Sequence, residues 1–301
     1  MKKSFTKTFL VDQSPGQVFE IVMDIRGWWQ GLHGEEFTGK TEQLNDEFTF
    51  RAGGGMHNTT QKLIEVIPNK KVVWLVTQSD LTFLKDHEEW KGTKLVFEIS
   101  KKENRTEFTF THEGLVPEIE CYDSCTTAWS MYLEERLLLR INSYSKTIAV
   151  NMSASKAFDS IKNFRGWWSE EIEGDTDVLN EIFFYHYKDI HLCKMKLIES
   201  IPGERLVYEV TENKFNFIDD QSEWVGTRLA FDILSEGRTT KITFVHEGLV
   251  PGDECFQVCN DAWNGYIGGS LKNFIETGKG NPNPKDEEGF NAELATKWGL
   301  N

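Results

Sequence analysis

The stretch HEGLVPEIECYDSCTTAW, residues 112–129, returns 134 residues later as HEGLVPGDECFQVCNDAW, residues 246–263. At the same offset, EWKGTKLVFEI at 89–99 returns as EWVGTRLAFDI at 223–233. Stacked-repeat proteins have periods of roughly 20–50 residues. This much longer repeat therefore predicts two tandem copies of one domain, each with its own core.

A third motif, RGWW, is also repeated, and the boundary between the copies falls near 142–143, where a helical pattern gives way to SKTIAV, the counterpart of the first strand. RGWW occurs at 26–29 and again at 165–168, an offset of 139 rather than 134. Five residues are therefore missing from the second copy after this motif, where GLHGEEFTGK and a Gly-Gly-Gly run of the first copy read as loops. We predict a first domain over 1–142, a second over 143–282, and a C-terminal tail over 283–301 that has no counterpart in the first copy.

Each copy begins with a short strand, and a helix follows it. In the first copy the strand is expected over residues 5–11. Ser14 is suited to cap the next helix, and Gln17 completes a capping box with it. The RGWW motif is expected to end this helix, with Gly27 and Gly166 as helix breakers.

Alternating apolar residues then predict several antiparallel strands with one wet face. A final helix shows apolar residues at spacings of three and four, which predicts a single stripe facing the sheet. In the first copy this stripe comprises Cys121, Cys125, Trp129, Tyr132 and Leu133. The fold class is therefore α+β: two domains, each a curved antiparallel sheet wrapped around a long C-terminal helix.

Composition narrows the function classes. The 301 residues carry a formal net charge of −15, whereas nucleic-acid-binding proteins present a basic face to phosphates, so we expect no nucleic-acid partner. No run reaches the roughly 18 apolar residues of a membrane span, and no signal-peptide core follows the N-terminal lysines. An odd number of cysteines, five, favours reduced thiols and a cytoplasmic protein. Because the duplication already supplies a pseudo-dimer, we expect a monomer or a weak oligomer.

Together these motifs resemble the START-like (SRPBCC) superfamily, whose helix-grip fold encloses an apolar cavity. The RGWW blocks, both EW segments, both HEGL segments and the cysteine-rich start of the last helix resemble more narrowly the bacterial relatives of the activator of the heat-shock protein 90 ATPase. The resemblance covers residues 5–141 and 145–281. The superfamily includes lipid carriers, polyketide cyclases and co-chaperones, so the resemblance implies the fold and leaves several functions open.

Two matched histidine pairs are the leading candidates for a binding site. His112 and His246 lie on aromatic strand faces, where an imidazole either orients a ligand or acts as an acid or base; the alternative is a buried histidine satisfied by the protein. His57 and His191 begin a second pair of strand faces, which either point inward or lie at the rim. The predicted ligand-binding residues are His57, Phe97, Phe110, His112, Trp129 and Tyr132, and their counterparts His191, Phe231, Phe244, His246, Trp263 and Tyr266.

The sequence shows no recognisable catalytic or metal-binding motif. No nucleotide-binding, hydrolase or zinc-helix motif occurs, so we name no catalytic residue and expect no cofactor. The pairs Cys121/Cys125 and Cys255/Cys259 have a spacing of four, whereas zinc sites use C-x2-C pairs and need three or four ligands. We therefore interpret these cysteines as core residues and expect no metal.

The sequence thus favours binding of a small hydrophobic or amphipathic molecule, or a lipid, between the sheet and the last helix of each domain. Two alternatives remain open at this stage. One is a co-chaperone or stress-response protein with a chaperone partner, as the resemblance implies. The other is a cyclase- or aromatase-like enzyme that uses a cavity histidine.

Overall fold

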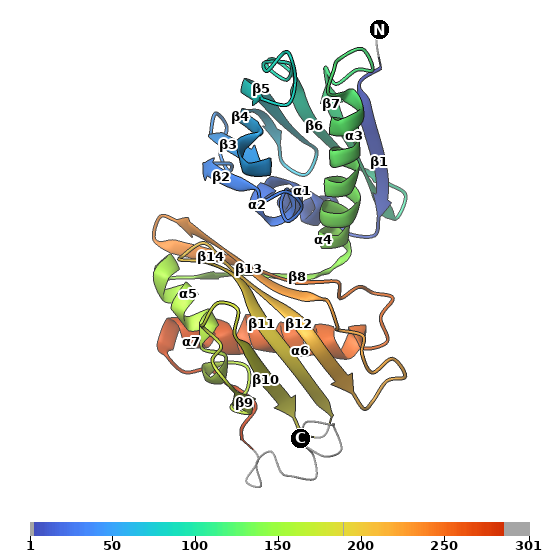
Figure 1. Cartoon of the computed structure of the whole chain (residues 1–301). Helices are drawn as coiled ribbons and strands as arrows, with labels where there is room; N and C mark the ends of the chain where they lie inside the picture. The colour runs from blue at the N-terminus through green and yellow to red at the C-terminus, as the bar shows by residue number, and fades with distance from the viewer. Residues whose placement is uncertain (1–2, 189, 286–301) are drawn as a thin grey trace. The chain divides into compact units, whose positions relative to one another are not determined.

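In the part of the chain that the structure describes, residues 3–188 and 190–285, each half forms one antiparallel sheet and one long C-terminal helix (Figure 1). The structure is a computed structural model. The two compact units divide between Asn142 and Ser143. Each unit has a separate buried hydrophobic cluster.

The first domain contains seven strands within its described residues. They are β1 (Phe5–Val11), β2 (Glu36–Gly39), β3 (Glu47–Ala52), β4 (His57–Ile67), β5 (Lys71–Leu81), β6 (Lys94–Lys102) and β7 (Arg105–Glu113). Its helices are α1 (Pro15–Met23), α2 (Ile25–Trp28), the 3-10 turn η1 (Gly53–Gly55), α3 (Tyr122–Met131), the π-helical segment η2 (Tyr132–Leu137) and α4 (Leu138–Asn142).

The second domain repeats this order. Its described strands are β8 (Tyr144–Val150), β9 (Ile172–Glu173), β10 (Ile182–Tyr187), β11 (His191–Ile201), β12 (Arg205–Phe215), β13 (Arg228–Glu236) and β14 (Thr239–Glu247). Its helices are α5 (Ala154–Lys162), the 3-10 turn η3 (Phe164–Gly166), α6 (Phe256–Gly265), the π-helical segment η4 (Tyr266–Leu271) and α7 (Lys272–Thr277).

Both sheets have the same topology. The strand order is β1-β7-β6-β5-β4-β3-β2 in the first and β8-β14-β13-β12-β11-β10-β9 in the second. The first strand of each domain thus pairs with the last one, and Phe5 lies opposite His112. The predicted capping box is present: the Ser14 side chain accepts from the Gln17 amide, and the Gln17 side chain accepts from the Ser14 amide.

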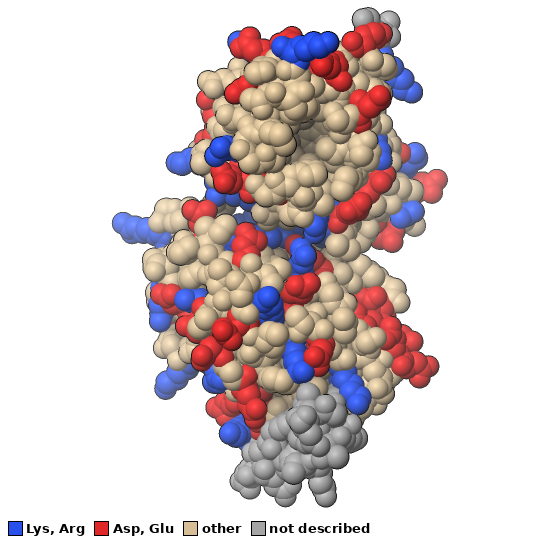
Figure 2. All heavy atoms as spheres, in the orientation of Figure 1, with Lys and Arg blue, Asp and Glu red and all other residues tan. Residues whose placement is uncertain are grey.

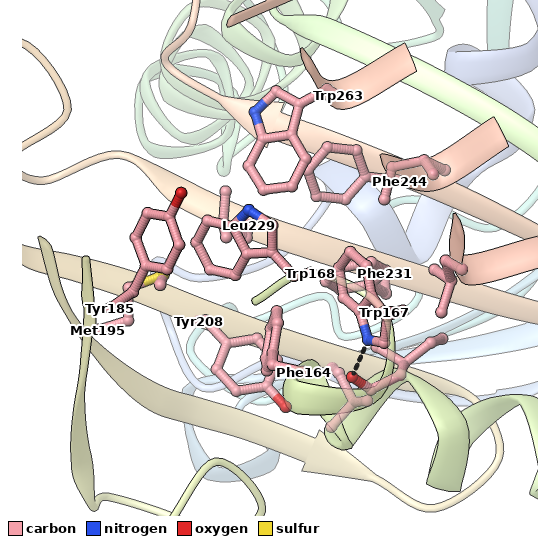
Figure 3. Close-up of a cluster of buried hydrophobic side chains, with 14 of the residues drawn as sticks. Phe164, Trp167, Trp168, Tyr185, Met195, Tyr208, Leu229, Phe231, Phe244 and Trp263 are labelled. Carbon is pink, nitrogen blue, oxygen red and sulfur yellow. Dashed lines mark hydrogen bonds between the residues drawn. The ribbon is translucent and has the colours of Figure 1, made fainter. Parts of the chain in front are cut away.

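The last helix of each domain packs on the apolar face of the sheet. Along β7 the side chains of Phe108, Phe110 and His112 are buried and alternate with more exposed ones. In the second domain, aromatic rings from the strands meet Trp263 of α6 (Figure 3). A curved sheet that grips its own C-terminal helix confirms the predicted α+β fold.

The role predicted for the glycines of RGWW is wrong. Helix α1 ends at Met23, and Gly27 lies inside the separate short helix α2. A Cβ atom on Gly27 would lie 2.2 Å from Asp24 Oδ2 and 2.8 Å from Arg140 Cζ. A Cβ atom on Gly166 would lie 2.3 Å from Phe274 Cζ. Both glycines therefore allow the last helix to approach closely, rather than breaking the first helix.

The interpretation of GLHGEEFTGK as a loop is only half right, because its second half forms β2. The sequence also gave no sign that the last helices contain the π-helical segments η2 and η4, which begin at the matched residues Tyr132 and Tyr266. Of the predicted tail 283–301, residues 286–301 lie outside the described residues. Asn283 is bridged in parallel to Ser169. No helix in the described part of the chain is both long enough and apolar enough to cross a membrane.

Candidate functional site

His112 and His246 each lie in a closed chain of hydrogen bonds. Trp129 Nε1 donates to His112 Nδ1 over 3.1 Å, and His112 Nε2 lies 2.9 Å from Thr93 Oγ1. Thr93 Oγ1 donates in turn to the Trp90 carbonyl over 2.6 Å. Because Nδ1 accepts, the imidazole proton is assigned to Nε2, which donates to Thr93.

The second domain repeats this chain. Trp263 Nε1 donates to His246 Nδ1 over 3.1 Å, and Thr227 Oγ1 lies 2.9 Å from His246 Nε2. Burial lowers the pKa of both histidines to about 3, and His57 and His191 add to the effect. Each imidazole is therefore neutral at pH 7, with both nitrogens engaged. This geometry favours the structural interpretation and leaves neither ring a free nitrogen for a ligand.

The same network explains the glycine of each HEG motif. Gly114 has a φ of +102°, in the left-handed region where a side chain is strained. A Cβ atom there would lie 2.7 Å from Thr93 Cγ2. Gly248 stands in the same relation to Thr227, at 2.8 Å. The glycine thus lets the threonine that holds the histidine approach.

The cysteine pairs belong to the docking of the last helix. Trp90 Nε1 donates to Cys121 Sγ over 3.2 Å, and the Glu89 carboxylate accepts from the Glu120 and Cys121 amides at the start of α3. Trp224, Cys255 and Glu223 repeat these contacts. All five cysteines are free and buried. Among the described residues, no group of three or more histidine, cysteine or acidic side chains is placed to hold a metal ion.

The aromatic residues predicted to line a cavity pack directly on one another. Phe97 and Phe110 have ring centroids 4.9 Å apart, and Phe110 and Trp129 4.6 Å apart. Trp29, from the RGWW motif, inserts between Phe50 at 4.4 Å and Trp129 at 4.8 Å. Much of the space between sheet and helix is therefore filled by rings, and the sequence did not identify Trp29 and Phe50 as partners in this packing.

The second domain is packed in the same way. Phe231 and Phe244 lie 4.8 Å apart, and Phe244 and Trp263 also 4.8 Å. Trp168 stacks on Tyr185 at 4.0 Å (Figure 3). Tyr132 and Tyr266 lie at the edge of these clusters, and each donates its hydroxyl proton to another segment, Tyr132 to the Glu35 carboxylate and Tyr266 to Asn283 Oδ1 over 3.0 Å.

The two domains differ at the second histidine pair. In the described structure, Nδ1 of His57 is buried and has no hydrogen-bond partner. Its ring meets Phe50 at 5.3 Å and Trp90 at 4.7 Å. Burial lowers the pKa of His57 to about 4. His57 is thus a neutral imidazole with an unused polar atom among aromatic rings.

His191, by contrast, has a hydrogen-bond partner and an aromatic ring packed against it. Its Nε2 lies 2.7 Å from Asn213 Oδ1, and the ring of Phe215 covers it at 4.3 Å. Burial lowers the pKa of His191 to about 4 as well, although the bond to Asn213 acts in the opposite direction. At the matching positions the first domain has the smaller Ser79 and Leu81.

An exposed apolar rim adjoins His57. Leu81 of β5 is paired with His57 of the neighbouring strand β4, and the Thr82 amide donates to the Met56 carbonyl over 2.9 Å. Met56 and Phe83 are 54% and 45% exposed. Figure 2 shows a hollow in the first domain, on the side where α3 faces the sheet, edged by residues without charge.

The inward face that begins at His57 is polar in the first domain only. Thr59 and Gln61 are buried there and bond to each other, whereas Cys193 and Met195 occupy the matching places. The predicted inward direction of this face is seen from Thr59 onward. His57 itself stands at its half-buried start.

The chain was compared with protein families, curated proteins and solved structures. No protein-family model and no curated protein matches the chain. Among solved structures, it is similar to the Aha1 dimer from Colwellia psychrerythraea, with 22% identity and a TM-score of 0.36 over 44% of this chain and 92% of that one.

The chain is also similar to two di-domain ARO/CYC proteins. One is StfQ from the steffimycin biosynthetic pathway, with 12% identity and a TM-score of 0.36 over 88% of this chain and 93% of that one. The other is BexL from the BE-7585A biosynthetic pathway, with 12% identity and a TM-score of 0.37 over 88% of this chain and 94% of that one. At these identities the likeness is one of fold.

Proposed function

We propose that the first domain binds a small, uncharged hydrophobic molecule that carries one hydrogen-bonding group. The molecule would enter past the rim of Met56 and Phe83 and direct its polar group to His57. The observation that carries the proposal is the buried Nδ1 atom of His57, which has no partner among the described residues. A buried polar atom without a partner costs about 1–3 kcal/mol, and a ligand that supplies the partner removes that cost.

The electrostatics of the site favour a neutral ligand. His57 is uncharged at pH 7 because burial lowers its pKa to about 4. The hollow in the first domain is edged by uncharged residues (Figure 2). An ionised ligand would therefore lose its hydration without gaining an opposite charge. Affinity would come from burial, and about 200 Å² of apolar surface contributes about 5 kcal/mol before the costs of ordering.

The proposal assigns this role to the first domain alone. The counterpart of His57 in the second domain is His191. It already has a hydrogen-bond partner, Asn213, and its ring packs against the ring of Phe215. His112 and His246 are not part of the proposal, because both ring nitrogens of each are engaged. An acid–base role for them would first require those bonds to break.

The test combines native mass spectrometry with a neutral fluorescent probe. The purified protein is weighed under native conditions and then denatured, so that any released molecule can be identified. Nile red is then titrated into the stripped protein. One equivalent per chain is expected.

A pair of opposite substitutions locates the site. Leu81→Phe gives the first domain the ring that covers His191 in the second, and it should weaken probe binding at least tenfold, which is about 1.4 kcal/mol. Phe215→Leu is the matched control in the second domain and should leave the first site unchanged. Undiminished binding by Leu81→Phe would rule out the site beside His57. A clean apo mass with no probe binding would instead favour a protein partner at the apolar rim.

A further inference from the structure

The two last helices hold different segments at matching positions. Tyr132 matches Tyr266, and Arg136, one turn further on, matches Ser270. In the first domain, Tyr132 donates to Glu35 and Arg136 donates to the Gly31 carbonyl over 2.8 Å. The helix therefore grips the loop 31–35, which follows the first RGWW motif.

That loop is organised around one carboxylate. Glu35 accepts from the Gly31 and His33 amides, each over 2.7 Å. Burial acts to raise the pKa of Glu35, but hydrogen bonds from Tyr132 and from backbone amides outweigh it and lower the pKa overall. The second copy is shorter after its RGWW motif and cannot build this loop.

In the second domain the same helix positions bind Asn281 and Asn283, from the segment 281–285, instead. Tyr266 donates to Asn283 Oδ1 over 3.0 Å, and Ser270 Oγ accepts from the Asn281 amide over 2.6 Å. Next to the second RGWW motif, the Asn283 amide donates to the Trp168 carbonyl over 2.9 Å, and the Asn283 carbonyl accepts from the Glu170 amide over 2.9 Å. The segment thus pairs with the chain through a single parallel β-bridge between Ser169 and Asn283.

The sequence NPNPK fits this one-sided pairing. The Lys285 amide donates to Glu170 Oε2 over 3.0 Å, so the amides of residues 281, 283 and 285 all bond to the second domain. The intervening Pro282 and Pro284 have no amide hydrogen, so no backbone donor of these two residues is left unsatisfied on the other side. Proline also restricts the unbound segment, which lowers the entropy lost on docking.

We infer that the second domain carries a groove for an extended Asn-Pro-type peptide, and that the chain's own residues 281–285 occupy it as an internal ligand. An added strand with alternate anchored residues is a recurring mode of peptide recognition. The segment keeps one side in water: Asn281, Pro284 and Lys285 are exposed. It also forms one wall of an open groove of about 640 Å³ along the outer face of η4. Its release would uncover Tyr266 and the backbone beside Trp168. The inference does not rest on the proposed function of the first domain.

Amide hydrogen exchange on the full chain tests whether the segment detaches. The Glu170 amide, which bonds to Asn283, should exchange by local opening, much faster than the amides in the middle of β13 and β14. Asn283→Ala removes the acceptor for Tyr266 and should speed this exchange roughly tenfold. Asn281→Ala is the matched control, because the bond to Ser270 uses its backbone amide and remains. Exchange at Glu170 as slow as in the sheet core would overturn the inference, since the segment would then be a fixed part of the fold.

A second experiment tests the groove in trans. In a chain that ends at Gly280, Glu170 exchange should be fast, and a synthetic peptide of residues 280–285 should slow it again. The same peptide with alanine in place of Asn283 should bind at least tenfold more weakly. If the truncated chain folds but the peptide does not slow Glu170 exchange, a preformed groove is refuted. If that chain does not fold, the measurements on the full-chain variants decide.

Discussion

Acid should destabilise both domains between pH 7 and pH 5. Each domain holds two neutral imidazoles: His112 and the half-buried His57 in the first, and His191 and His246, both buried, in the second. Burial lowers their pKa values to about 4 and about 3 in each pair. Protonation of His112 or His246 has a further structural cost, because Nδ1 would then point a proton at the tryptophan N–H that now donates to it.

The size of the effect follows from proton linkage. An unfolded histidine takes up its proton near pH 6.5. Between that pH and about 4 the unfolded state therefore binds more protons than the folded state, and the free energy of unfolding falls as the pH falls. From pH 7 to pH 5 each buried histidine removes about 2 kcal/mol, which gives about 4 kcal/mol per domain. That is a large part of the roughly 5–15 kcal/mol of a typical domain.

The assay is urea unfolding at pH 7, 6 and 5, followed by tryptophan fluorescence, since each domain has buried tryptophans. His57→Leu and His191→Leu each remove one titrating group and should each abolish about half of the loss in their own domain. In parallel, the imidazole carbon protons of the four histidines should show no NMR titration step above pH 5. A stability that stays flat from pH 7 to pH 5, or a titration step near 6.5, would refute the burial argument.

Three substitutions test the packing and the loop. Gly27→Ala should destabilise the first domain by about 2 kcal/mol or more, because its Cβ would collide with the ion pair of the buried Arg140. Gly166→Ala should cost the second domain about 1–3 kcal/mol by pressing on Phe274; urea midpoints measure both, and an unchanged midpoint contradicts either. Glu35→Gln should weaken the hydrogen bonds that order the loop and so speed its amide exchange at pH 7. The expected loss is only about 1 kcal/mol of local opening free energy, because the carboxylate is half exposed. The difference from wild type should vanish at low pH, as Glu35 protonates below its usual range; a difference that persists there would contradict the charge-based explanation.

The fold could be predicted from the sequence because each signal occurs twice. The capping box at Ser14 and the alternation that buries Phe110 and His112 are local patterns with one physical interpretation. The repeat then showed that both halves must satisfy the same architecture. The role of Gly27 was missed because it depends on Arg140, which lies far away in the sequence and reaches the glycine only in the folded domain.

The candidate site was harder to predict, since what matters there is whether a polar atom has a partner. The sequence identified His57 and His191 as a pair but could not separate them. Asn213 and Phe215 lie two strand positions apart on the neighbouring strand β12, and only the register brings them onto His191. The grip of the helix on residues 281–285 was also unpredictable, because the segment has no counterpart in the first copy.

The two copies provide an internal comparison that separates packing from specialised function. The chain of Trp129, His112 and Thr93 is repeated by Trp263, His246 and Thr227 with the same distances, so it serves the shared fold. If so, Trp129→Phe and Trp263→Phe should destabilise their own domains by equal amounts, about 1–3 kcal/mol each, because each leaves one buried Nδ1 atom unpaired.

Neither change should alter the difference in probe binding between the domains, because that difference arises from side chains that the copies do not share. Two matched pairs differ beside the histidine: Leu81 in the first domain matches Phe215 in the second, and Ser79 matches Asn213. The measurement is the urea midpoint of each domain together with Nile red stoichiometry for the two tryptophan variants. A loss of stability in only one of the two domains would show that the network has a separate role there. His112 or His246 would then be a candidate functional residue of that domain alone.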